Sequence, residues 1–390
     1  MKQQRLKSLN VPLLMTPGPT QVRENVRRVR AAEMTNPDLE PEFFKFYRKT
    51  CLKLASFLNT KSQVLILSGE GMVALDSACA SLTEAGDRVL ILDNGIFGEG
   101  FADMVQVYGA EPVVFKGERT RGLSAEDLRA FLEQDSDFKF ATIVHCDTPS
   151  GVLNDLKEIC PLLKSYGILT VVDAVSSMVS EPLFIDDWGI DICMGASQKG
   201  FSAPPGLAFV SVSNEAWTAI ENRKTPVPSY YCNLPLWKNY YEELWFPYTP
   251  PIGDIYAFRA ALDNILKEGG AFKRHRKIAK AVRKAVIRSG LSLYLVSDYC
   301  GSVTAIRVPE GLNGEEIVQK MKEEYGVLIG GNFGYLKGNV IRIGHMGENA
   351  REKYVSETLK ALQLTLESLS ISFFADMESV FLKETGKKKR

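Results

Sequence analysis

Two residues of opposite charge, Asp173 and Lys199, follow apolar segments near the middle of the 390-residue sequence. Asp173 ends the strand-like run 169–173, and Lys199 stands 26 positions later, shortly after the apolar run 192–196. Because ligands of open α/β sheets bind at the carboxyl edge of the strands, both side chains can reach one site. A lysine that loses its proton there becomes a nucleophile, and burial favours that loss. The pair therefore predicts covalent chemistry on an amine.

These two groups are also those that pyridoxal 5'-phosphate requires from a protein. A lysine forms a Schiff base with the aldehyde, and an aspartate keeps the pyridine nitrogen protonated, so that the ring accepts the electrons of a substrate carbanion. Taken singly, a strand-end aspartate is more often a cap or turn residue, and a lone lysine almost always lies on the surface. Gln198 and Lys199, however, lie in a glycine-rich, otherwise apolar segment, where a charged side chain requires a partner.

A phosphate-binding turn is predicted at residues 68–72, which follow one strand and open a helix. Free backbone N–H groups and the helix dipole bind phosphate at such a helix start, although a plain strand-to-helix turn has the same pattern. Gly69, Gly71 and Ala74 also fit the G-x-G-x-x-A pattern of dinucleotide-binding folds. Asp93 ends the next strand, about where such folds place the acid that binds the ribose. The local residues leave these interpretations open.

The elements that must position these residues alternate along the first half of the chain. Helices are predicted at residues 72–82, 97–107 and 155–166, and Ser124 is the expected N-cap of a further helix. Alternation at this spacing predicts a mainly parallel α/β sheet with helices on both faces. The predicted strands are 63–67, 88–92, 112–115, 140–146, 169–173, 192–196 and 207–212.

The pattern changes after residue 225. Residues 225–251 hold six prolines and many aromatic side chains, so an irregular segment is predicted there, followed by a helix at 254–267. Helices at 271–289, 314–325 and from 349 onward, with strands at 291–296, 303–308 and 340–343, predict a second, α+β domain. We expect an N-terminal arm over residues 1–14, a large domain over 15–267 and a small C-terminal domain over 268–390.

Composition argues against several classes of function. Basic and acidic residues balance, 47 against 47, so no nucleic-acid partner is expected, and the basic run 387–390 is interpreted as a solvated terminus. Three scattered histidines predict no metal cluster. No membrane span is expected, and residues 1–10 lack the apolar stretch of a signal peptide. Seven cysteines without a C-x-x-C pair are expected to be reduced thiols in a cytoplasmic protein.

The ordered motifs of the chain resemble the class V, fold-type I aminotransferases, which use pyridoxal phosphate, and most closely the alanine–glyoxylate and serine–pyruvate group. The resemblance covers most of the chain through LMTPGPT, SGEGMVALDSA, DNGIFGEGF, HCDTPSGVLND, VDAVSSMVSEPL, GASQKGFSAPPGLAF, YTPP and IRIG. It implies a large domain with a mainly parallel seven-stranded sheet between helices, plus a smaller α+β C-terminal domain. It also favours the pyridoxal interpretation over the dinucleotide one.

The resemblance implies a role for each matching residue around the cofactor. Lys199 matches the Schiff-base lysine, and Asp173 matches the partner of the pyridine nitrogen. Phe97 matches the stacking aromatic residue, where relatives often have Trp, and Thr148 matches the hydroxyl near the phenolic oxygen. The phosphate contacts resemble the Gly71 and Met72 backbone, Gln198 and, from the neighbouring subunit of a homodimer, Tyr248 or Thr249. Glu70 departs from the family, because relatives usually have a small polar residue beside the phosphate.

On the substrate side, the resemblance implies that Arg342 holds the carboxylate bidentately and that Gly18 leaves room for a small substrate. The implied reaction moves an amino group from alanine or serine to glyoxylate or pyruvate by ping-pong transamination, with Lys199 as covalent anchor and general acid/base. Other donors, 2-aminoethylphosphonate or ureidoglycine, suit the same residues. A lyase of the cysteine desulfurase type, with Cys300 as its cysteine, and a non-enzymatic protein that kept the fold are the alternatives.

Overall fold

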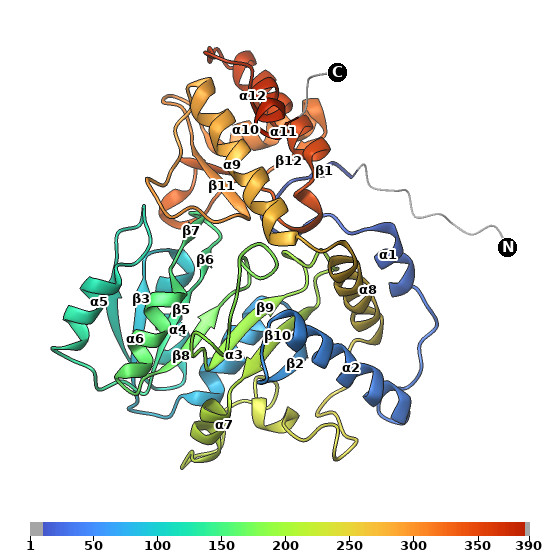
Figure 1. Cartoon of the computed structure of the whole chain (residues 1–390), viewed down its shortest axis with the longest axis vertical. Coiled ribbons are helices and arrows are strands. Elements are labelled where there is room, and N and C mark those ends of the chain that lie inside the picture. Colours follow the sequence, from blue (N-terminus) through green and yellow to red (C-terminus); the bar gives the residue numbers. More distant parts are fainter. Residues whose placement is uncertain (1–10, 387–390) are drawn as a thin grey trace.

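Seven strands form the central sheet of the larger body of the molecule in the computed structural model, which describes residues 11–386 (Figure 1). Every neighbouring pair is parallel except the two made by β10, which runs antiparallel to β2 and β9. The expected mainly parallel seven-stranded sheet is confirmed. In spatial order the strands are β2 (Gln63–Ser68), β10 (Leu207–Val212), β9 (Ile192–Ala196), β8 (Leu169–Asp173), β5 (Phe140–Val144), β3 (Arg88–Asp93) and β4 (Glu111–Lys116).

Helices cover both faces of this sheet (Figure 1). The central strands β5, β9 and β10 are buried at every position, as expected for strands that are covered on both sides. The predicted cap is also present, because the Ser124 hydroxyl accepts a hydrogen bond of 3.1 Å from the Asp127 N–H. The helices are α1 (Glu24–Arg30), α2 (Pro41–Phe57), α3 (Gly71–Leu82), α4 (Ile96–Val107), α5 (Ala125–Leu132), α6 (Leu156–Ser165), α7 (Asn214–Glu221), η1 (Leu234–Trp237) and α8 (Ile252–Glu268).

The strand order contradicts the dinucleotide interpretation. Gly69 and Gly71 follow β2 at one edge of the sheet, whereas Asp93 ends β3, and β10, β9, β8 and β5 lie between these two strands. A ribose-binding acid must stand on a strand next to the glycine-rich turn. The two features are therefore unrelated.

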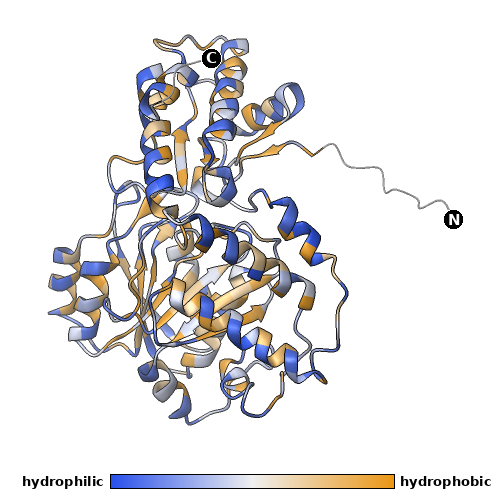
Figure 2. Cartoon of the chain, turned by 45° about the vertical axis from the view of Figure 1, so that its right-hand side comes forward, coloured by the Kyte–Doolittle hydropathy of each residue, from blue (hydrophilic) through white to orange (hydrophobic). Residues whose placement is uncertain are grey.

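The smaller body packs on one end of the larger one (Figure 1). It has its own apolar core, which includes Met15, Ile278, Ile317 and Leu362. Figure 2 shows apolar strands inside both bodies and hydrophilic helix faces outside. The elements of the smaller body are β1 (Leu13–Leu14), α9 (Ala271–Ser289), β11 (Val303–Arg307), α10 (Gly314–Tyr325), β12 (Val327–Leu328), η2 (Gly334–Leu336), β13 (Val340–Gly344), η3 (Gly347–Asn349), α11 (Glu352–Ser368) and α12 (Met377–Glu384). A hairpin of β6 (Cys146–Asp147) and β7 (Val152–Leu153) faces it from the larger body.

Two predicted elements of the smaller body differ in the structure. Residues 291–296 form no strand, and their backbone pairs with β11 at a single bridge between Leu293 and Ile306. The reason is that the Val296 N–H donates to the Thr120 carbonyl of the larger body, which draws the chain away from β11. The predicted final helix ends at Ser368, and a separate helix, α12, follows.

The start of the described chain belongs to both bodies. β1 pairs in parallel with β12, and Met15 is buried in the core of the smaller body, whereas α1 packs beside α8 of the larger one. We propose the boundary between the large and small domains at residues 267–268, near the end of α8. The expected arm 1–14 overlaps β1, and residues 1–10 and the basic run 387–390 lie outside the described residues. Over residues 11–386, no helix combines the length and apolar character that a bilayer crossing needs.

Candidate functional site

A cavity of about 170 Å³ lies at the edge of the central sheet where β2, β8 and β9 lead into their following loops. Tyr248, Thr249 and Arg342 are not among its lining residues. The fold brings the other predicted residues together from distant parts of the sequence. Those that line the cavity are Gly18, Gly71, Met72, Phe97, Thr148, Asp173, Gln198 and Lys199, together with Pro19, Glu70, Leu75 and Val175.

Lys199 reaches into this cavity from the turn after β9. Its Nζ donates a hydrogen bond of 2.8 Å to the Pro17 carbonyl. Burial, followed by the charge of Arg342, lowers the pKa of Lys199 from 10.5 to about 8, although Asp173 acts in the opposite direction. A Cβ on Gly18 would lie 2.4 Å from Lys199 Cδ, so the room that this glycine provides is used by the lysine itself. The neutral, nucleophilic amine is thus more accessible near neutral pH than on an exposed lysine.

Asp173 is the last residue of β8, and its carboxyl group is buried in the same cavity. Burial raises the pKa of Asp173 to about 6, while a hydrogen bond of 2.8 Å from the Val175 N–H and the charge of Lys199 act in the opposite direction. The group is therefore mostly ionised at neutral pH. A buried carboxylate is suited to bind a protonated ring nitrogen.

Phe97 and Thr148 provide a flat ring and a hydroxyl on the cavity wall. Phe97 stands in the first turn of α4, and its ring lies edge-on to Phe333 with centroids 6.2 Å apart. The Thr148 hydroxyl is hydrogen-bonded to the hydroxyl of Ser176. The Phe97 N–H donates a bond of 3.1 Å to Asp147, which fixes the start of α4 at this wall.

The start of α3 forms another side of the cavity, where Gly71 and Met72 are the first helical residues. Glu70 is the N-cap, and its carboxylate accepts a hydrogen bond of 3.1 Å from the Met72 N–H. Gln198 is only 7% exposed, and its buried Oε1 has no hydrogen-bond partner among the described residues. The cavity wall thus contains one polar atom without a partner, Gln198 Oε1, and one carboxylate, that of Glu70, which already accepts a hydrogen bond from the start of α3.

Arg342 lies on β13 of the smaller body and adjoins the cavity through Thr148. Its Nε donates to the Gly331 carbonyl at 2.8 Å, and one terminal nitrogen donates to the Thr148 carbonyl at 3.3 Å. Burial lowers the pKa of Arg342 to about 10, and the charge of Asp147 partly opposes this shift. Arg342 is 9% exposed, and its guanidinium remains charged at neutral pH and is fixed in orientation by these bonds, unlike an edge-strand arginine in solvent.

Tyr248 and Thr249 lie away from the cavity of their own chain. The Tyr248 ring stacks on Tyr231, with centroids 4.0 Å apart and planes inclined by 7°. The Thr249 hydroxyl donates to Asp38 at 3.3 Å. The chain does not bring these two residues to its own Lys199, and their predicted contact with a second subunit stays a prediction.

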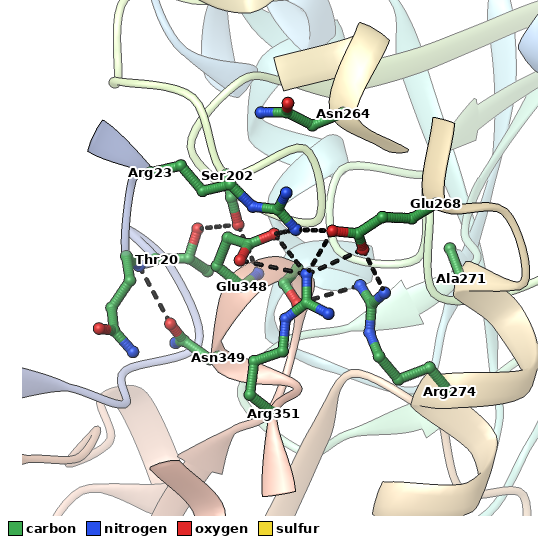
Figure 3. A network of polar contacts seen from close by, with 12 residues as sticks. Thr20, Arg23, Ser202, Asn264, Glu268, Ala271, Arg274, Glu348, Asn349 and Arg351 are labelled. Carbon is green, nitrogen blue, oxygen red and sulfur yellow. Dashed lines mark hydrogen bonds and ion pairs between the residues drawn. The ribbon is translucent and has the colours of Figure 1, made fainter. Parts of the chain in front are cut away.

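The turn that carries Lys199 continues to Ser202, which binds two other segments through Thr20 and Glu348 (Figure 3). The Thr20 hydroxyl lies 3.1 Å from the Lys199 carbonyl and 2.9 Å from the Ser202 hydroxyl. The Ser202 hydroxyl also accepts a bond of 2.8 Å from the Glu348 N–H in η3 of the smaller body. Asn349 joins the same segments, since its side chain accepts from the Gln21 N–H at 3.0 Å. Lys199 is therefore held from both bodies at once.

A cluster of five charged side chains surrounds this junction (Figure 3). Arg23 bridges Glu268 at the end of α8 and Glu348 of the smaller body. Arg351 binds the same two carboxylates at 2.9 and 3.0 Å, and Arg274 of α9 binds Glu268 at 3.1 Å. These ion pairs connect the N-terminal segment, the end of α8 and both domains at one point.

Sequence reasoning missed three residues that position the site, namely Asp147, Thr20 and Ser202. Asp147 is fully buried, binds Ser150 Oγ at 2.7 Å as well as the Phe97 N–H, and lies close enough to affect Arg342. Its signal was its place after a strand, next to Thr148. Thr20 and Ser202 gave no local signal, because their partners lie far away in the sequence.

Comparison with known proteins identifies the family. Residues 19–331 match the family model described as Aminotransferase class-V. The chain belongs to the class V aminotransferases. This class V aminotransferase is 35% identical over 361 residues to an uncharacterised aminotransferase of Methanocaldococcus jannaschii, with 92% of this chain and 93% of the relative covered.

Two further comparisons carry more specific names. A pyridoxamine–pyruvate transaminase of Mesorhizobium japonicum is 31% identical to the class V aminotransferase described here, with 83% of this chain and 84% of the relative covered. The crystal structure of ureidoglycine–glyoxylate aminotransferase from Bacillus subtilis has a TM-score of 0.94 at 27% identity, covering 98% of this chain and all of that one. The protein is thus a transaminase with a fold-type I architecture.

The class V aminotransferases depend on pyridoxal phosphate, and most of the cavity fits that cofactor. Lys199, Asp173 and Phe97 offer an amine, a carboxylate and a flat ring, which suit an aldehyde, a ring nitrogen and a ring face. The unsatisfied Gln198 Oε1 marks a place where a ligand can supply a partner. The phosphate end fits less well, because the Glu70 carboxylate already binds the Met72 N–H.

Proposed function

We propose that this class V aminotransferase moves an amino group from alanine or serine to glyoxylate or pyruvate by ping-pong transamination. The observation that carries the proposal is the convergence of Lys199 and Asp173 in one small buried cavity, with the charged Arg342 beside it. The relatives named for pyruvate and for glyoxylate support a small 2-oxo acid as acceptor.

In the proposed reaction, pyridoxal phosphate supplies an aldehyde and an electron-withdrawing ring. Lys199 would hold it covalently, and the Lys199 amine would move the proton to and from the substrate α-carbon. Asp173 keeps the ring nitrogen protonated, since its carboxylate is buried and ionised at neutral pH. Phe97 would pack on the ring, the Thr148 hydroxyl would bind the phenolic oxygen, and the start of α3 with Gln198 would hold the phosphate.

We assign the substrate carboxylate to Arg342, whose planar guanidinium can form two parallel charge-assisted bonds. The contact of Arg342 with Thr148, which lines the same cavity as Lys199, supports this assignment. This assignment favours donors that carry an α-carboxylate over 2-aminoethylphosphonate. Ureidoglycine has such a carboxylate and stays an alternative donor, supported by the name of the Bacillus subtilis structure.

The desulfurase alternative receives no support from the geometry. A desulfurase needs a cysteine on a mobile loop, whereas Cys300 has no exposed surface and packs against Cys146, Val303 and Met346. All seven cysteines are free and buried, which supports the proposed reducing, cytoplasmic compartment.

We also propose a homodimer in which Tyr248 or Thr249 contacts the cofactor phosphate of the partner. Exposed aromatic residues on the segment before them support this, since Tyr230, Tyr231 and Trp245 are 63%, 48% and 44% exposed. Aromatic side chains of this kind are enriched in protein interfaces.

A half-reaction screen tests the proposed function. The holoenzyme is mixed with single amino acids, and the loss of the bound cofactor's absorbance is followed for each. Alanine or serine should react fastest, and glyoxylate or pyruvate should restore the spectrum. Lys199→Ala should show no such change, and borohydride reduction of wild type should fix the cofactor on one peptide that contains Lys199. Labelling of a different lysine would contradict the assignment.

A further inference from the structure

Glu70 stands where a phosphate group would have to bind. The N–H groups in the first turn of a helix are the donors that hold phosphate. In α3 one of these donors, the Met72 N–H, already gives its hydrogen bond to the Glu70 carboxylate. A phosphate oxygen can use this N–H only if it displaces Glu70, and the two anions would then lie side by side.

The charges around the cavity do not offset this repulsion. Among the described residues that line it, the charged ones are Glu70, Asp173 and Lys199. Lys199 is committed to the aldehyde end of the ring and to Pro17. Glu70 is an exposed residue that lines the cavity, and its charge also acts on Asp173 and Lys199. Tyr248 and Thr249, even if supplied by a partner subunit, are neutral.

A second observation concerns Gln198, which lines the same cavity and is only 7% exposed. Its buried Oε1 has no hydrogen-bond partner among the described residues. The amide can present either its oxygen or its nitrogen inward, because a flip exchanges the two. Gln198 therefore suits a hydroxyl or a phosphate equally. Glu70 decides between them, because a carboxylate accepts a hydrogen bond from a hydroxyl and repels a phosphate dianion.

We propose that Glu70 makes the site selective for a vitamin B6 ring with a 5′-hydroxymethyl group, so that unphosphorylated pyridoxal and pyridoxamine bind in preference to their phosphates. The proposal rests on the roles of Lys199 and Asp173 in the proposed function. It adds the selection, by Glu70, of the 5′ substituent of the ring. A ring held without its phosphate is a substrate that enters and leaves, and is not a resident group.

The corresponding reaction uses pyridoxamine as amino donor, in place of the alanine or serine of the proposed function, and keeps a 2-oxo acid as acceptor. The C–N bond of pyridoxamine breaks, and its carbon is oxidised to the aldehyde of pyridoxal. The keto carbon of the acceptor is reduced by the same two electrons and gains the amino group. Its oxygen leaves as water when the imine forms, and one water is consumed when the final imine is hydrolysed to the aldehyde. The Lys199 amine carries the proton between the two carbons, so the reaction needs no other oxidant or reductant.

Equilibrium binding to the full-length apoprotein tests the proposal without reliance on turnover. Pyridoxal and pyridoxal phosphate are each titrated into the protein, and bound ligand is measured by absorbance and by dialysis. Wild type should bind pyridoxal on the order of tenfold more tightly or better, as expected for two like charges in contact. Glu70→Ser, which keeps an uncharged N-cap acceptor, and the isosteric Glu70→Gln should each move this ratio at least about tenfold toward the phosphate.

Glu99→Gln is the matched control, since Glu99 is in the first turn of the neighbouring helix α4 and does not line the cavity. It should leave the ratio unchanged. In a second arm, wild type with pyridoxamine and pyruvate should form equal amounts of pyridoxal and alanine. A wild-type protein that prefers pyridoxal phosphate, or Glu70 variants with an unchanged ratio, would overturn the proposal. Neither result affects the assignment of Lys199, which borohydride labelling tests separately.

Discussion

At the scale of single residues, the lowered pKa of Lys199 predicts how fast cofactor is taken up. Covalent attachment requires the neutral amine, and burial lets Lys199 lose its proton near pH 8 instead of 10.5. The rate constant for attachment of pyridoxal phosphate or pyridoxal to apoprotein should therefore rise with pH and level off above a midpoint near 8. Stopped-flow absorbance measures it directly. A midpoint close to the value of an exposed lysine would show that burial does not act as described.

Asp173 allows a test of the ring-nitrogen contact. Asp173→Asn keeps the shape and removes the charge, so the nitrogen would lose its proton. Turnover should fall at least ~100-fold, about 2.7 kcal/mol of transition-state stabilisation. Asp93→Asn is the control, because Asp93 is likewise buried at a strand end but does not line the cavity. Equal losses in both variants would indicate a structural effect only.

Arg342 tests the assignment of the substrate carboxylate. Arg342→Lys keeps the charge and loses the planar pair of donors. The Michaelis constants for both the amino acid and the 2-oxo acid should rise, with a loss of about 1.5–3 kcal/mol in kcat/KM. Arg307→Lys on the neighbouring strand β11 should have little effect, since that residue is exposed. Weaker binding of the B6 ring with unchanged substrate constants would argue against the assignment.

At the scale of elements, the turn after Lys199 depends on one hydroxyl. Ser202 adopts a positive φ of 55° and accepts the Glu348 N–H. Ser202→Ala keeps the strain and removes the acceptor, so the free energy of unfolding should fall by about 1–3 kcal/mol. Ser202→Gly removes the same acceptor but relieves the strain of the positive φ, so its free energy of unfolding should fall by less than that of Ser202→Ala. Denaturant titration separates the two.

Ser289→Ala serves as the control for these variants. Its buried hydroxyl bonds only to the Val286 carbonyl of its own helix, so its loss leaves no donor without an acceptor. A loss for Ser289→Ala as large as that for Ser202→Ala would mean that burial of any serine hydroxyl, and not the link to Glu348, accounts for the effect.

The elements that could be predicted from sequence are those whose pattern is set locally. The strands at 169–173, 192–196 and 207–212 match because strands that are covered on both faces have nearly unbroken apolar sequences, and this holds for the antiparallel β10 as well as for the parallel β8. Residues 291–296 have a similar run, but a long-range bond from Val296 turns them away from β11. Motif resemblance located the cavity-lining residues, whereas Thr20 and Ser202 act through partners that no local pattern reveals.

At the scale of the whole molecule, the proposed homodimer predicts complementation between inactive variants. One variant, Lys199→Ala, lacks its own amine, and a double variant, Tyr248→Phe with Thr249→Ala, lacks the groups offered to a partner. A mixed dimer contains one site with both sets intact, so mixing should restore activity that neither parent has. Sedimentation should show dimers throughout. If mixed dimers are shown to form but have no activity, Tyr248 and Thr249 do not contribute to the partner's site.

The pairing of β1 with β12 has a consequence for how the protein is made. Leu13 pairs with Val327, so the first described strand finds its partner only after most of the chain has left the ribosome. Pro17 and Thr20, which contact Lys199, follow β1 directly in the sequence. We expect the pairing of β1 with β12 to fix their position. The central sheet can form earlier, since its last strand is complete at Val212. We therefore expect the contacts of Lys199 with Pro17 and Thr20 to form after the central sheet, once β1 can pair with β12.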